Sequence, residues 1–135
     1  MRKEVLKEPG FAAQIVEIIK STRSIDEMTE KLKDFHDKDI AQSFELLNTA
    51  ERNLLYSALD AEWLADIISY IDNPAQYVEE IGIEKLAAII NEMDADDAVD
   101  LWSVIEESVK VKLRPMIDDE TKTDIRLINS YEEDE

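Results

Sequence analysis

Apolar residues recur along most of this chain at spacings of three or four, which gather side chains on one face of an α-helix. Polar residues and turn formers interrupt the pattern at short intervals. The apolar stripes fall within residues 40–47, 54–59, 64–71, 77–81, 86–93, 98–105, 109–116 and 125–128. The pattern predicts an all-α chain of about nine or ten short helices, most of them two to three turns long.

Signals for helix starts agree with this division. Ser24 followed by Glu27 is a capping box that predicts a helix from about Ile25. Asn73-Pro74 is expected to supply an N-cap and a proline at the first helical position. Gly82 is expected to end one short helix and begin the next. Further N-caps are expected at Asp37, Thr49, Asp60, Asp94 and Asp118.

Three stretches of the chain, residues 60–68, 82–90 and 94–102, align without gaps. Each begins with Asp or Gly, continues with a polar turn, and places two apolar residues on either side of one small or acidic residue. Residues 36–44 fit this pattern more loosely. Because such short helices need neighbours to cover their apolar faces, we expect helices and helix pairs to stack as a small right-handed superhelix that resembles an α-solenoid.

Charge is distributed unevenly. Residues 1–35 hold seven acidic and seven basic residues, whereas residues 36–135 hold 26 acidic and eight basic ones and account for the net charge of −18. We expect one superhelical domain over residues 1–129, with charge-neutral N-terminal helices in residues 1–35. The negative field argues against nucleic acid as a partner and favours cations and basic protein surfaces. From composition alone, charge that only maintains solubility is the simpler alternative.

Residue types that carry catalysis are scarce. The chain has one histidine, His36, and no cysteine, Gly-rich phosphate loop or nucleophile elbow. His36 lies beside a helix start, where a cap or packing role is expected, and Trp102 falls on a core stripe. We therefore expect no enzyme; paired carboxylates acting as acid and base are the alternative. Without cysteines, a secretory signal or a long apolar run, the chain by itself is expected to be soluble and cytoplasmic.

The acidic cluster of residues 94–100 is the most specific chemical feature. Asp96 and Asp100 are four residues apart, so both project from one helical face while Ala98 and Val99 turn toward the core. Asp66 occupies the same polar position of its repeat as Asp100 does, so the superhelix could bring the three carboxylates to one surface. Such oxygens suit hard divalent cations such as Mg²⁺. An ordinary solvated acidic face remains the alternative, which spacing alone favours.

Three segments also carry a family resemblance: Leu-Ala-Asp-Ile-Ile at 64–68, Asp-Asp-Ala-Val-Asp-Leu-Trp at 96–102, and Arg-Leu-Ile-Asn-Ser-Tyr-Glu-Glu-Asp-Glu at 126–135. From about His36 to its end, the chain resembles the cytosolic N-terminal domain of the MgtE family of magnesium transporters and channels. The resemblance implies a right-handed superhelix of short helices. It also implies that residues 130–135 form an acidic linker toward a pair of CBS domains and a membrane pore, which lie outside this chain.

The function that the resemblance implies is regulatory. Intracellular Mg²⁺ would bind weakly between acidic surfaces of this domain and the CBS domains of the same polypeptide and help to close the pore. Carried over by position, Asp66, Asp96 and Asp100 resemble the interfacial Mg²⁺ ligands, although many relatives have Glu where this chain has Asp66. The full-length protein is expected to form a homodimer, with this domain on the cytoplasmic side of the cell membrane.

A second hypothesis is a function that does not depend on cation binding. The helical repeats are also similar to the superhelical domains of the flagellar motor switch protein FliG, which implies a protein–protein interaction module without dependence on a divalent cation.

Overall fold

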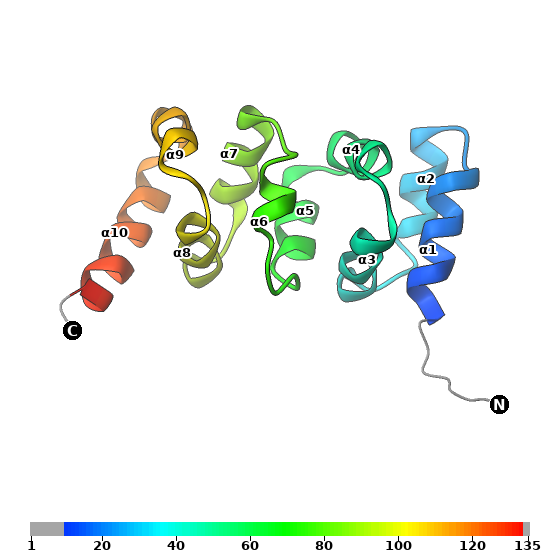
Figure 1. The fold of residues 1–135 in the computed structure, drawn as a ribbon, viewed down its shortest axis with the longest axis horizontal. Helices are drawn as coiled ribbons and strands as arrows, with labels where there is room; N and C mark the ends of the chain where they lie inside the picture. Colours follow the sequence, from blue (N-terminus) through cyan, green and yellow to red (C-terminus); the bar gives the residue numbers. More distant parts are fainter. Residues whose placement is uncertain (1–9, 134–135) are drawn as a thin grey trace. The chain divides into compact units, whose positions relative to one another are not determined.

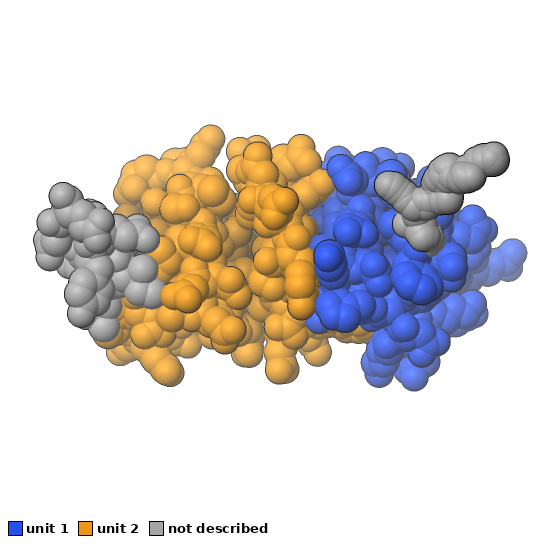
Figure 2. Space-filling view, turned by 90° about the horizontal axis from the view of Figure 1, so that it is seen from below, with its two compact units in different colours: residues 1–59 blue, residues 60–135 orange. Residues whose placement is uncertain are grey.

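The computed structural model describes the backbone of residues 10–133 and the side chains of residues 11–126. Within this part of the chain every regular element is helical: ten α-helices and two short 3₁₀ helices, with no strand (Figure 1). This confirms the expected all-α class and the expected number of short helices. The chain divides after Leu59 into two compact units, coloured separately in Figure 2.

The first unit contains α1 (Gly10–Ser21), α2 (Ile25–Leu32), α3 (Asp37–Ser43), the 3₁₀ helix η1 (Phe44–Leu46) and α4 (Thr49–Ala58). Helix α1 packs against both α2 and α3. Their apolar stripes form a core that includes the fully buried Ile15, Met28, Leu32, Ile40, Phe44 and Leu55. The ring of Phe44 meets that of Tyr56 edge to face, with centroids 6.0 Å apart, an arrangement that aromatic rings prefer.

Helices α3 and α4 start one residue earlier than the sequence suggested. The N-cap of α3 is His36, whose Nδ1 accepts a hydrogen bond of 2.9 Å from the backbone N–H of Lys38. The N-cap of α4 is Asn48, which forms a reciprocal capping box with Glu51. Asp37 and Thr49, the expected caps, are instead the first helical residues. The N-cap of α2 is Ser24, as predicted, and its side chain accepts a hydrogen bond from the backbone N–H of Glu27.

The second unit contains α5 (Ala61–Ile68), α6 (Ala75–Val78), α7 (Ile83–Glu92), α8 (Ala95–Ser103), α9 (Glu107–Leu113), the 3₁₀ helix η2 (Arg114–Met116) and α10 (Asp119–Glu133). Helix α7 is central, since it contacts α5, α8, α9 and η2, while α10 packs against α8. The buried core includes Leu64, Ile67, Leu86, Ile89, Ile90, Leu101 and Leu113.

The aligned stretches of the sequence correspond to one structural unit repeated three times. Asp60, Gly82 and Asp94 are the N-caps of α5, α7 and α8. In all three helices the four apolar positions of the alignment lie in the core, apart from Trp102, which is only partly buried. The position between the apolar pairs points outward and is exposed at Asp66 and Asp100. The alignment therefore predicts the rotation of each helix about its axis.

Two other helix starts in this unit can be compared with the sequence. Asp118 precedes α10 and accepts a hydrogen bond of 2.9 Å from Thr121 N–H, as expected of an N-cap. At α6 the N-cap is Pro74 rather than Asn73, and it makes no side-chain capping bond. Proline offers no side-chain acceptor, so this four-residue helix begins without the polar cap that the sequence suggested.

The two ends of the described part of the chain can be compared with the expected N-terminal segment and the expected linker. The backbone of α10 continues as helix through Glu133, into the segment that we expect to be an acidic linker. Residues 1–9, at the start of the expected neutral segment, and residues 134–135 lie outside the described residues. None of the described helices combines the length and apolar character that crossing a membrane requires.

Candidate metal-binding surface

Helices α5 and α8 carry the three carboxylates that the sequence singles out. Asp66 lies in the last turn of α5, and Asp96 and Asp100 lie on α8. All three side chains are exposed. The outward direction of Asp66 and Asp100 follows from the apolar pairs on either side of each residue, which turn into the core and leave the intervening position to the solvent. Asp96 lies one turn before Asp100 and therefore on the same face of α8. Each of the three residues is therefore accessible to solvent, whereas their gathering on one surface and their role as ligands stay predictions.

The carboxyl of Asp97 lies in a partly buried and acidic environment. Its pKa is raised above the ordinary value, first because the group is partly removed from water and then because of the charges of Asp94, Asp100, Asp96 and Asp66. Asp94 is the N-cap of α8, and Asp96 and Asp100 lie within that helix, but Asp66 comes from α5. The fold thus brings the carboxylate of one repeat within electrostatic reach of the cluster in another.

A hollow of about 400 Å³ opens beside this cluster. Asp97 and Asp100 of α8 line it together with Asp72, which follows α5 in the chain. The charged side chains in the lining are all carboxylates, and the remainder are apolar or hydroxyl groups: Ile68, Ser69, Ile71, Pro74, Met93, Leu101, Ser103 and Val104. Asp66 and Asp96 are not part of this lining. The expected set of three ligands is therefore only partly gathered at the hollow.

Two serines in the lining hold the ends of α5 and α8 in the same way. Ser69 Oγ donates to the carbonyl oxygen of Asp66 at 2.6 Å, and Ser103 Oγ donates to that of Asp100 at 2.7 Å. These bonds satisfy carbonyl groups that the last turn of a helix leaves without a helical partner. They also fix the backbone that carries two of the predicted ligands.

Carboxylate oxygens are the donors that Mg²⁺ prefers, and this ion commonly keeps several waters while binding one or two protein carboxylates. The donor chemistry of the surface fits that ion. No group of three or more His, Cys, Asp or Glu among the described residues is arranged to hold a metal ion alone. The residues present could thus supply part of a coordination shell, with water or a second surface completing it.

Sequence reasoning did not single out Asp72 or Asp97 as site residues. Asp97 was visible as a member of the acidic cluster, but its partial burial depends on how α8 packs. Asp72 lies in the loop between α5 and α6, outside the aligned stretches, and nothing in its local sequence indicates that it faces α8. Its position beside Asp97 and Asp100 follows from tertiary structure alone.

Comparison with known proteins agrees with the all-helical fold. The family model described as the MgtE intracellular N domain matches residues 35–134. Among solved structures, the chain is similar to one described as the crystal structure of the soluble part of a magnesium transporter, with 27% sequence identity and a TM-score of 0.75. That match covers 86% of this chain and 46% of the other, so the chain spans about half the length of that protein.

A comparison with curated proteins gave no match. The family model nevertheless covers about three quarters of the chain, from the residue before the N-cap of α3 into the end of α10, and it includes α5 and α8 with all of the acidic residues described above. Sequence, fold and family model agree, and the chain belongs to the family of MgtE intracellular N domains.

Proposed function

We propose that this chain is a regulatory domain of an MgtE-like magnesium transporter and that it senses intracellular Mg²⁺ through the acidic surface of α5 and α8. In this proposal the domain lies on the cytoplasmic side of the membrane. Its partners are the CBS domains and the transmembrane pore of the same polypeptide, in a homodimer. The family membership and the similarity to a magnesium transporter's soluble part support this assignment.

The observation that carries the proposal is the acidic hollow beside α8, whose charged lining residues are Asp72, Asp97 and Asp100. The pKa of Asp97 is raised there, first by partial burial and then by neighbouring carboxylates that include Asp66 of α5. Neighbouring carboxylates disfavour one another's charged forms, and protonation or a bound cation relieves the repulsion between them. Exposed Asp66, Asp96 and Asp100 can each offer oxygens to an ion that also touches a second surface. We therefore assign them as interfacial ligands, with Asp72 and Asp97 completing the acidic surface.

The proposed mechanism depends on distance. Exposed charges that are separated by more than a Debye length of about 8 Å are largely screened at physiological ionic strength. A bridging Mg²⁺ instead acts at contact distance between the two acidic surfaces, where attraction is far stronger. When Mg²⁺ is scarce, the surfaces repel and the domain separates from its partner. The ion shifts this equilibrium only because it binds the joined state more tightly than the separated one.

The test is made in the full-length transporter. Replacing both Asp96 and Asp100 by asparagine (Asp96→Asn/Asp100→Asn) removes two carboxylates at nearly constant side-chain size. We expect pore closure, followed as Mg²⁺-dependent loss of ion flux in vesicles, to require a Mg²⁺ concentration higher by about tenfold or more, corresponding to a loss of at least about 1.4 kcal/mol.

The control is Asp34→Asn/Glu45→Gln, which removes the same charge from exposed positions in the first unit. Its Mg²⁺ response should equal that of the wild type. An unchanged response in the Asp96→Asn/Asp100→Asn variant would contradict the proposal and favour an interaction module without cation dependence.

A further inference from the structure

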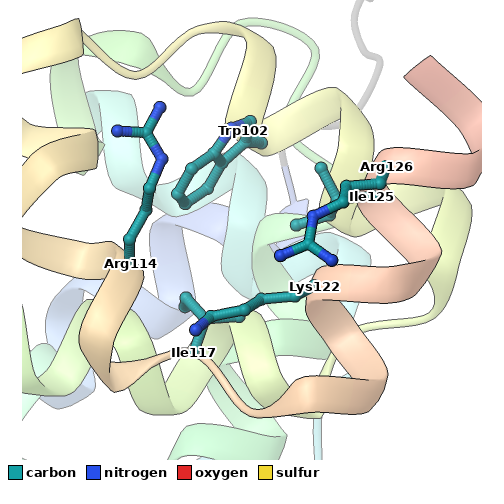
Figure 3. Close-up of a pocket in the computed structure, with 6 residues that line it drawn as sticks. All are labelled: Trp102, Arg114, Ile117, Lys122, Ile125 and Arg126. Carbon is teal, nitrogen blue, oxygen red and sulfur yellow. The ribbon is translucent and has the colours of Figure 1, made fainter. Parts of the chain in front are cut away.

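A second hollow in the chain has the opposite charge. Its volume is about 260 Å³, and Figure 3 shows the residues that line it: Trp102 from α8, Arg114 from η2, Ile117 from the segment that follows, and Lys122, Ile125 and Arg126 from α10. Every charged side chain in this lining is basic. We refer to this hollow as the Trp102 pocket.

Such a gathering of basic side chains is unexpected in this chain. Residues 60–135 contain 22 acidic and only six basic residues. Five of those six lie between residues 110 and 126, and three of them line the pocket. A surface charge that served solubility alone would not require the few cations to converge on one aromatic side chain. The packing of α10 against α8 brings them there.

The indole of Trp102 lies among four of these cations. Lys110 Nζ is 5.6 Å and the Arg114 guanidinium carbon 5.9 Å from its ring centroid, both within the range of cation–π attraction. Arg114 also forms an ion pair of 3.1 Å with Glu107, which offsets part of its charge. In Figure 3, Arg114 and Arg126 lie on opposite sides of the indole, and the Lys122 side chain runs below the ring toward Ile117.

Lys122 and Arg126 therefore supply the positive charge that is still open to a ligand. No ion pair recorded among the described residues involves either of them. Ile117 and Ile125, which also line the pocket, are buried and give it an apolar floor. The combination of an aromatic wall, an apolar floor and basic groups at the rim is complementary to a molecule with an apolar ring and an anionic substituent.

We propose that the Trp102 pocket binds a small organic anion that carries a flat ring, of the class of aromatic phosphates. Guanidinium and ammonium groups form short, charge-assisted hydrogen bonds with phosphate oxygens. An aromatic ring gains further from contact with the indole. The volume lies just below the range of about 300–1,000 Å³ that is typical of sites for drug-sized ligands, so the ligand is compact.

Extended polyanions fit the same surface less well. The net charge of −18 repels a nucleic acid or an anionic membrane over long range, and the pocket offers few cations against it. A compact anion interacts mainly with the basic groups that it touches. The cations also surround one hollow and do not follow an open groove, which favours a small molecule over an acidic peptide.

The test uses the complete chain and three probes: phenyl phosphate, inorganic phosphate and phenol. Affinity is measured by calorimetry, and the indole N–H signals of Trp102 and Trp63 are followed by NMR. We expect phenyl phosphate to bind about tenfold more tightly than either inorganic phosphate or phenol. It should shift the Trp102 signal while leaving that of Trp63, which does not line the pocket, in place.

The variants Lys122→Gln and Arg126→Gln are made singly. Each should weaken the binding of phenyl phosphate by about tenfold, because each loses one charge-assisted contact. The controls Lys38→Gln and Lys85→Gln remove basic charges outside the lining and should bind as the wild type does. Three results would overturn the proposal: inorganic phosphate binding as tightly as phenyl phosphate, equal shifts of both indole signals, or tighter binding of a hexaglutamate peptide.

Discussion

At the scale of single residues, the helices of the first unit depend on side chains that satisfy their terminal N–H groups. Asn48 shows this most fully. Its side-chain oxygen accepts a hydrogen bond of 2.8 Å from the backbone N–H of Glu51, and Glu51 Oε1 in return accepts one of 2.9 Å from the backbone N–H of Asn48. Glu51 also pairs with Lys20 of α1 at 3.3 Å. The hydrogen bond from Asn48 and the charge of Lys20 both lower the pKa of Glu51. One cap thus connects α4 with α1.

We predict that Asn48→Ala lowers the free energy of unfolding by about 1 kcal/mol, because alanine cannot accept the capping hydrogen bond. Urea denaturation followed by circular dichroism measures the change. The control is Asn53→Ala, an exposed position inside the same helix, where alanine is the better helix former and no loss is expected. Equal losses in the two variants would show that the cap has no special role.

Asp97 gives a second prediction at this scale. Because its folded-state pKa lies above the ordinary value, the folded protein binds more protons than the unfolded chain between those two values, and this residue's contribution to stability falls as pH rises through that window. Removing the charge of Asp66 should weaken the effect. We therefore predict that Asp66→Asn lowers the pKa of Asp97, measured by NMR titration of the side-chain carboxyl carbons.

Asp118 serves as the reference in that titration. Its pKa is lowered by hydrogen bonds from the side chain and backbone of Thr121, so it should titrate below Asp97 and should not respond to Asp66→Asn. A pKa of Asp97 that is unaffected by the substitution would show that α5 and α8 do not bring their carboxylates into electrostatic reach.

At the scale of helices, the sequence predicted more than the number of elements. The alignment of residues 60–68, 82–90 and 94–102 placed the N-cap position of three helices correctly, together with every buried apolar position except Trp102 and the exposed position at Asp66 and Asp100. It succeeded because one physical requirement, an apolar face at a fixed distance from the helix start, is repeated with the same spacing, although only Asp60 makes a side-chain capping bond. The exposure of Asp66 and Asp100 follows directly from it.

The periodic pattern did not predict which residue caps a helix or which side chains of distant helices meet. At residues 36–37 and 48–49 two adjacent side chains can each accept a capping bond, and only the backbone geometry decides between them. Asp72 and the Trp102 pocket depend on contacts between helices that are distant in sequence. The sequence placed Trp102 on a core stripe, but its large ring reaches past the core toward the basic residues of η2 and α10. Periodicity describes one helix at a time and carries no such information.

Asn91 illustrates a connection between elements that can be tested. At the end of α7, its Nδ2 donates to the carbonyl oxygen of Met116 at 3.2 Å, and its Oδ1 accepts from Asp118 N–H at 2.9 Å. We predict that Asn91→Ala lowers the free energy of unfolding by about 1–2 kcal/mol through the loss of two hydrogen bonds. Amide hydrogen exchange should also become faster in η2 and the first turns of α10.

The neighbouring substitution Glu92→Ala provides the control, since Glu92 is exposed and belongs to the same helix. Exchange rates in α10 that are equal in the two variants would show that Asn91 does not hold this segment to α7.

At the scale of the whole molecule, the dominant property is the distribution of charge. Residues 1–59 carry 11 acidic and nine basic residues, whereas residues 60–135 carry 22 acidic and six basic ones, so nearly all of the net charge belongs to the second unit. The proposed cation-binding surface lies in that unit. In the proposed interfacial site a second acidic surface supplies part of the ligands, so the chain by itself should bind Mg²⁺ only weakly, and strong binding should require that second surface.

The most direct test of this account is hydrogen exchange on a polypeptide that extends past Glu135 through the segments that follow in an MgtE-like transporter. Mg²⁺ is raised through the millimolar range at constant ionic strength, with the present chain and the Asp96→Asn/Asp100→Asn variant as controls. We predict new protection around Asp66 and residues 94–100 in the extended wild type and little change in either control. A folded extended protein without protection at these residues would contradict the proposal that Mg²⁺ joins this surface to its partner.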